Sequence, residues 1–228
     1  MTAKSSVPVT GRDEFERKFM ITLIEDAARA LQRFESAESV ESAHFETQAV
    51  RRDLVRSLHA TMEGVVWTYR EHVVSAAKSL GELSPHEEIA FSEESVRVSE
   101  KGTISMQRRS LTIASTIRLT TRIAKRLHPA VTSDFDTKNW ANFRSSVTTR
   151  NRLTHPKTMG DLAVSKAEAS SCIAALYWLI ELTITGMEAS NVAMKGFAKG
   201  LAEAAKGLKA GDPEIMAAYR TVLDASEG

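Results

Sequence analysis

The chain has a single cysteine among its 228 residues, and this scarcity excludes a scaffold held together by disulfide bonds. Such sparing use of cysteine is typical of a reducing compartment, so we expect a cytoplasmic protein. Cys172 itself lies in an apolar run beside Ile173 and Ala174, and we interpret it as a core residue rather than a nucleophile.

Neither sign of charge is in excess, since 30 Lys and Arg face 29 Asp and Glu, for a net charge of +1. This balance excludes a global attraction to nucleic acid, so any RNA binding must use a local patch. The 6 histidines are scattered, and the sequence has neither a His-x-x-x-His pair nor a pair of cysteines. A phosphate-binding glycine loop and a nucleophile elbow are also missing. We therefore expect no metal and no cofactor.

Long hydrophobic runs are absent as well. The most apolar segment, from Cys172 to Ile184, is interrupted by Glu181 and is shorter than a membrane span. Lys4 is not followed by the apolar run of a signal peptide. These features predict that the protein has no membrane partner.

What the sequence does have is apolar residues recurring at intervals of three and four, which predicts long helices. We expect them near residues 12–34, 45–80, 108–127, 135–155 and 162–187, with Ser133 or Asp134 capping the fourth. Alternating residues around Lys101 and Gly102 predict a small β-hairpin near 95–106. The fold class is therefore an all-α bundle of long antiparallel helices, divided into an N-terminal extension (1–44), a main helical domain (45–190) and a C-terminal tail (191–228).

The tail carries an apolar stripe that contains Phe197 and Leu201, with lysines on the other faces. Gly196 and Gly200 add a pair of small residues one helical turn apart. Such a helix can lie on a membrane surface or pack closely on the body or a partner. The thin, Ala- and Gly-rich apolar side favours packing.

The strongest functional signal is the segment from Arg150 to His155, which reads Arg-Asn-Arg-Leu-Thr-His and is followed by Pro156. Arginine presents a permanent forked cation that matches phosphate oxygens. Histidine moves a proton readily near neutral pH. Asn151 can orient either group, so the three side chains suit metal-free chemistry on a phosphodiester.

Spacing alone does not select this segment, because Arg52 with His59 and Arg122 with His128 are similarly spaced. The polar Asn151 directly after Arg150 distinguishes it from Arg122, which Ile123 follows, although Arg52 also has a polar neighbour.

Helix geometry supports a single site made of Arg150, Asn151 and His155 only in part. On a straight helix Asn151 and His155 share a face, whereas Arg150 and His155 point about 140° apart. Pro156 disfavours helical backbone at His155, so we expect the helix to end there. The alternative is that Arg150 and Arg152 are ordinary solvated cations at a helix end and that His155, before Pro156, is simply a C-cap.

Arg-Asn-x-x-x-His in a helical chain, ahead of a long apolar helix, resembles the HEPN superfamily over about residues 45–190. The resemblance implies a dimeric helical bundle in which arginine and histidine from both chains meet in a cleft. Many members are metal-independent endoribonucleases of toxin–antitoxin or antiphage systems, and others are non-catalytic binding modules. Some toxins carry a modified tyrosine two positions after the histidine, where this chain has Lys157.

Carried over, the resemblance makes Arg150, Asn151 and His155 the catalytic residues and implies RNA, a second copy and an antitoxin or regulatory protein as partners. Arg152 is a candidate RNA-binding residue. Arg118, Arg122 and Arg126, spaced by four, form one basic stripe on a helix. This stripe either follows RNA phosphates or is a solvated helix face.

Overall fold

The computed structural model describes residues 11–39, 44–132 and 135–226. It confirms the all-α fold with one small hairpin, since these ranges form seven α-helices, one 3-10 helix and two strands. In chain order the elements are α1 (Gly11–Ser39), α2 (His44–Ser79), α3 (Pro85–Ser92), β1 (Glu94–Val98), β2 (Ile104–Arg108), α4 (Ile113–Leu127), α5 (Lys138–Thr154), η1 (Met159–Leu162), α6 (Lys166–Ala210) and α7 (Pro213–Ser226).

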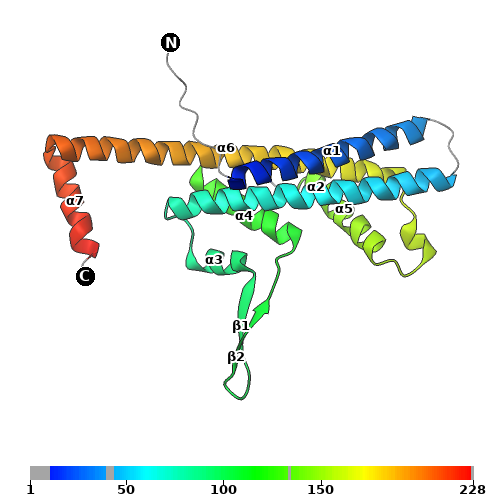
Figure 1. Ribbon diagram of the computed structural model, residues 1–228, viewed down its shortest axis with the longest axis horizontal. Coiled ribbons are helices and arrows are strands. Elements are labelled where there is room, and N and C mark those ends of the chain that lie inside the picture. The colour runs from blue at the N-terminus through cyan, green and yellow to red at the C-terminus, as the bar shows by residue number, and fades with distance from the viewer. Residues whose placement is uncertain (1–10, 40–43, 133–134, 227–228) are drawn as a thin grey trace, which may run out of the picture.

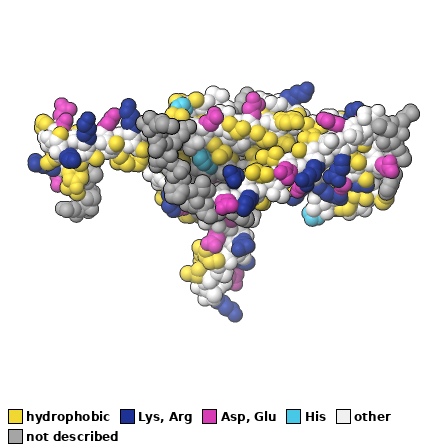
Figure 2. Space-filling model, turned by 45° about the horizontal axis from the view of Figure 1, so that its top comes forward, with side chains coloured by type: hydrophobic (Ala, Val, Ile, Leu, Met, Phe, Trp, Pro, Cys, Tyr) yellow, Lys and Arg dark blue, Asp and Glu magenta, His cyan; other side chains and the backbone are white. Residues whose placement is uncertain are grey.

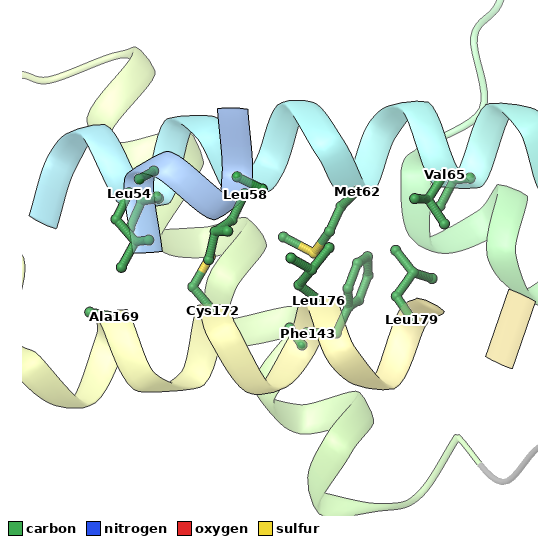
Figure 3. Packing of buried hydrophobic residues seen from close by; sticks show 14 of the residues in the cluster. Leu54, Leu58, Met62, Val65, Phe143, Ala169, Cys172, Leu176 and Leu179 are labelled. Carbon is green, nitrogen blue, oxygen red and sulfur yellow. The ribbon is translucent and has the colours of Figure 1, made fainter. Parts of the chain in front are cut away.

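The helices α1, α2 and α6 run along the long axis of the molecule, and α4 and α5 pack against α2 and α6 (Figure 1). Side chains of α2 such as Leu54 and Leu58 face Cys172 and Leu176 of α6, and Phe143 reaches this layer from α5 (Figure 3). Each large apolar side chain buried in this way contributes about 1.5–3 kcal/mol to stability. Burial also raises the pKa of the Cys172 thiol to about 12, as befits a core residue.

Local capping signals explain where the shorter helices begin. Ser84 and Glu87 form a reciprocal capping box with Pro85 in the first turn, which starts α3 in a segment where no helix was expected. Helix α5 is capped by Thr137, whose hydroxyl accepts the Trp140 N–H. The predicted caps, Ser133 and Asp134, lie outside the described residues.

The predicted end of the last long helix near residue 187 is wrong, because α6 continues to Ala210. The segment after 187 has no proline and is rich in alanine, so nothing stops the helix before Gly211. Gly211 has φ 71° and donates its N–H to the carbonyls of Gly207 and Leu208. The expected domain boundary at 190/191 thus falls inside one helix, and the three-part division stays a prediction.

Toward its C-terminal end α6 extends past the other long helices, and α7 turns away from its end (Figure 1). Asn191 and Met194 still line a hollow together with Ser75 and Ser79 of α2. By length and composition alone α6 could cross a membrane, but its Cys172 and Leu179 lie in the core of the bundle.

The hairpin also projects from the bundle (Figure 1). Val96 pairs with Met106 and Val98 with Ile104, so all four apolar side chains share one exposed face of the ribbon, which Figure 2 shows as hydrophobic.

Candidate functional site

The candidate site lies where α5 ends. His155 is the C-cap: its N–H donates to the Asn151 carbonyl at 3.1 Å, and its φ of −128° and ψ of 60° leave the helical region. The prediction that the helix ends at His155 is therefore confirmed. Pro156 supplies the physical cause, since its ring clashes with a helical conformation of the preceding residue.

Arg150 connects α5 to α2. Its Nη2 donates to Glu63 Oε1 at 2.8 Å, and its Nη1 donates to Asn151 Oδ1 at 3.3 Å. The arginine side chain is 35% exposed and that of Glu63 is 51% exposed, so water screens the ion pair. A guanidinium has five N–H donors, and three of those on Arg150 have no partner among the described residues. These can still reach a phosphate.

Asn151 and His155 are both exposed and lie on the outward face of α5, in line with Arg144 and Thr148. Within the described ranges the His155 imidazole forms no hydrogen bond. The structure therefore brings Arg150 to Asn151 and leaves the imidazole of His155 unattached one turn further on.

Arg152 has a different environment. Its Nη1 donates to the carbonyls of Gly160, Asp161 and Ala163 at 3.2, 3.1 and 2.7 Å. Its Nη2 pairs with Glu168 at 2.6 Å. Burial raises the pKa of Glu168, but the hydrogen bonds from Ser165 and the cation of Arg152 outweigh it and lower the pKa. Arg152 thus fastens η1 and the start of α6 to the end of α5.

Of the three arginines of the basic stripe on α4, Arg118 and Arg126 contact other side chains, and Arg122 has no partner among the described residues. The Arg118 guanidinium lies 4.9 Å from the centre of the Trp140 ring and 5.2 Å from that of Phe135.

At the other end of the stripe, Arg126 holds both oxygens of Glu87, at 2.6 and 2.8 Å, and lowers the pKa of that carboxyl to about 2. Arg122 is exposed and makes no hydrogen bond or ion pair with any residue that the structure describes.

A second histidine lies beside the site and was not expected there. His59 of α2 is 3% exposed and has a hydrogen bond to the backbone of Ser146 in α5. Burial first, and then the positive charge of Arg150, lower its pKa to about 4. Its Nε2 has no hydrogen-bond partner in the described part of the chain. His59 precedes Glu63 by four residues, about one helical turn. This spacing is the sequence signal that could have placed both on one face of α2.

Glu63 also lines a shallow hollow with Trp67 and Arg70 of α2 and with Ile113 and Thr116 of α4. Because Glu63 is also the ion-pair partner of Arg150, the hollow lies next to this pair, and it is open to solvent. Over the described ranges, the structure has no group of three or more His, Cys, Asp or Glu side chains placed to hold a metal ion.

Comparison with known protein families, with curated proteins and with solved structures finds no match to this chain. The likeness to the HEPN superfamily therefore depends on the Arg150–His155 segment and its helical setting.

Proposed function

We propose that the protein is a metal-independent endoribonuclease of the HEPN type that acts in the cytoplasm within a toxin–antitoxin or antiphage system. One observation carries this proposal: Arg150, Asn151 and His155 lie in the last turn and C-cap of one helix, where the Asn151 amide holds the guanidinium and the exposed imidazole has no partner in the described ranges. A cation with spare donors can stabilise the charge that develops on the phosphate, and an accessible imidazole can transfer the proton. Both are needed for metal-free cleavage of a phosphodiester.

In the proposed reaction the 2′-hydroxyl of the RNA attacks the adjacent phosphorus. A bond forms between the 2′ oxygen and phosphorus, and the bond from phosphorus to the 5′ oxygen breaks. His155 takes the proton of the 2′-hydroxyl or gives one to the departing 5′ oxygen. Arg150 stabilises the charge that develops on the phosphate oxygens, and Asn151 orients the guanidinium. The products are a 2′,3′-cyclic phosphate and a 5′-hydroxyl.

A second copy is part of the proposal. Arg150 turns toward α2 and Asn151, whereas His155 extends from the outward face about 140° away on the helix. A dimer in which the histidine of one chain meets the arginine of the other would complete both sites. An antitoxin or regulatory protein would then act by covering this end of α5.

The second candidate is a non-catalytic module that binds RNA or a protein partner. It is favoured by the ion pair between Arg150 and Glu63, which partly neutralises the cation. It is also favoured by the internal contacts of Arg152, Arg118 and Arg126, because these leave Arg122 as the one member of the predicted RNA-binding set without a described partner.

The test compares wild type with His155→Ala on mixed cellular RNA in the presence of a chelator, with the product ends mapped chemically. We expect cyclic phosphate ends from wild type and a loss of at least about 100-fold in the variant.

The matched control is His128→Ala, because His128 also caps a helix and precedes a proline. Cleavage that survives in His155→Ala, or that stops on adding the chelator, would contradict the mechanism. Absence of cleavage by wild type together with partner binding unaffected by His155→Ala would favour the binding module.

A further inference from the structure

The shallow hollow between α2 and the start of α4 is walled mainly by apolar side chains. These walls are Val66 and Trp67 of α2 together with Leu111 and Ile113. Along α2, the first and last residues beside the hollow are charged, namely Glu63 and Arg70. The hollow is therefore an apolar recess with a carboxylate at one end and a guanidinium at the other.

Trp67 differs from the other two tryptophans of the chain in its surroundings. Trp140 and Trp178 pack with each other and with Phe143 in an aromatic cluster of α5 and α6. Trp67 is only partly buried and lines the hollow, and an edge-on contact with Phe19 of α1, at 6.2 Å between ring centres, holds its indole in place. A partly exposed indole that is held in this way can serve as a stacking platform for a flat ring.

The charges around the hollow suit a neutral ring better than a phosphate. Arg70 donates to Glu71 at 3.0 Å and to Glu93 at 3.1 Å, so two carboxylates already balance its charge, and Glu63 is paired with Arg150. Three of the five N–H donors of Arg70 are used in its bonds, and the other two have no partner among the described residues. Arg70 is thus held in position and can donate to acceptors on the edge of a bound ring.

Glu63 connects the hollow to the candidate site. Its Oε1 accepts from Arg150 Nη2 at 2.8 Å, and its side chain also lines the hollow. Trp67 follows Glu63 by about one helical turn, which is about 6 Å along α2. A phosphate on the spare donors of Arg150 and a ring stacked on Trp67 are therefore close enough to belong to one nucleotide or to two neighbouring ones.

We propose that this hollow holds the nucleobase beside the scissile phosphate, stacked on Trp67 and recognised on its edge by Arg70. The inference rests on the proposed ribonuclease, because Arg150 would place the phosphate. Guanine presents two adjacent acceptors, O6 and N7, which is the pattern that arginine donors recognise. Adenine has an amino group in place of O6, so a donor would face a donor. We therefore expect a preference for guanine in this hollow.

The first test measures the affinity for a short single-stranded RNA that contains one guanine, in the His155→Ala background so that the RNA stays intact. We expect Trp67→Leu to weaken binding about 5- to 150-fold, and Trp67→Phe, which keeps an aromatic ring, to weaken it less. The matched control is Tyr177→Leu, because Tyr177 is 59% exposed on α6 and lies outside the hollow. Equal affinities for Trp67→Leu and Trp67→Phe, or an equal loss in the control, would overturn the proposal.

A second test separates stacking on Trp67 from any effect of the substitution on the fold. The guanine of the RNA is replaced by an abasic nucleotide, and both RNAs are bound to the chain with Trp67 and to Trp67→Leu. Removing the base should weaken binding when Trp67 is present and have little further effect in Trp67→Leu, because the same contact is then already lost. Two losses that simply add would show that the base and the indole do not touch.

A third test concerns recognition of the base edge by Arg70. Hypoxanthine keeps O6 and N7, so it should bind like guanine, whereas adenine should bind about 5- to 150-fold more weakly. Arg70→Lys should remove this preference, since lysine lacks the forked donors. A preference that survives in Arg70→Lys would refute the role of Arg70. Guanosine monophosphate that binds as tightly as the RNA would assign the hollow to a free nucleotide and overturn the assignment to RNA.

Failure of this inference differs from failure of the proposed ribonuclease. Cleavage by wild type, together with equal RNA affinities for Trp67→Leu and Trp67→Phe, would contradict the base site and leave the ribonuclease standing. Absence of cleavage by wild type, together with an effect of the abasic nucleotide that depends on Trp67, would support the base site and contradict the catalysis. The binding measurements therefore test the hollow without relying on the activity.

Discussion

The two long faces of α5 differ in what their polar side chains contact. The inward face buries Trp140, Phe143 and Leu153 against the bundle. On the outward face Asn151 and His155 are exposed, and neither side chain bonds outside α5 in the described ranges. The inward face thus fixes the position of the helix, and the outward face leaves its functional groups available to a ligand.

A similar contrast holds between Arg150 and Arg152, although only one residue separates them in the sequence. Arg152 is tied to three carbonyls and one carboxylate, and Arg150 makes one screened ion pair and one contact with its neighbour. Replacing each residue in turn should therefore separate a loss of chemistry from a loss of stability.

The largest effect should come from Arg150→Ala. We expect kcat/KM for RNA cleavage to fall about 100- to 1,000-fold, because an oriented cation is lost where charge develops. Stability should change by no more than about 1 kcal/mol, because the pair with Glu63 is screened. Cleavage kinetics and urea unfolding on one preparation measure both.

The matched control is Glu63→Ala, which removes the same ion pair and keeps the guanidinium. It should retain cleavage. If both variants lose cleavage equally, the reaction needs the ion pair between Glu63 and Arg150, and the guanidinium alone is not sufficient.

The next effect concerns the buried His59. Its pKa is about 4 in the folded chain and 6.5 in the reference state, so the unfolded chain binds more protons between these values. The neutral imidazole therefore favours the folded state fully above about pH 6.5, and this advantage is lost as the pH falls toward 4. Between about pH 7 and pH 4.5 the free energy of unfolding should drop by about 2–3 kcal/mol.

His59→Gln should remove this drop, and His155→Ala on the outward face should leave it unchanged. Glu87 does not affect this pH range. Its pKa is lowered from 4.5 to about 2, so its contribution to stability is lost only as the pH falls below about 4.5. A pH profile identical in wild type and His59→Gln would show that the burial of His59 has no energetic effect.

These two predictions also mark how far the sequence alone could go. Periodicity predicted the helices, alternation predicted the hairpin, and Pro156 predicted the end of α5, because each signal is local. The partners of Arg150 and Arg126 were not predictable, since Glu63 lies 87 residues away and Glu87 lies 39 residues away in the chain. Packing decides such contacts.

The role of His59 was missed for the same reason. The sequence pairs it with Arg52 and leaves that pair open, whereas the arginine whose charge acts on it in the fold is Arg150. The predicted end of α6 failed differently: the apolar stripe of the tail was assigned to a separate segment, although no proline interrupts the helix between residue 187 and Gly211.

A moderate effect should follow Arg152→Ala. Four hydrogen bonds from its guanidinium are lost, including one to the carboxylate of Glu168, so we expect a loss of about 2–3 kcal/mol in urea unfolding. Arg144→Ala, on the outward face, should change stability by less than about 0.5 kcal/mol. Equal destabilisation by the two changes would mean that the hydrogen bonds of Arg152 add no more to the free energy of unfolding than an exposed arginine does.

The smallest effect tests the basic stripe of α4. If the stripe follows RNA phosphates, Arg122→Ala should weaken RNA binding only a few-fold and reduce the salt dependence by about one charge, because it removes one cation that does not order the fold. Arg126→Ala should instead lower stability and leave the salt dependence nearly unchanged, since its charge is already committed to Glu87. Measuring RNA affinity at several salt concentrations separates the two. If neither change alters the slope, the stripe is a solvated helix face and RNA binding must depend on the outward face of α5.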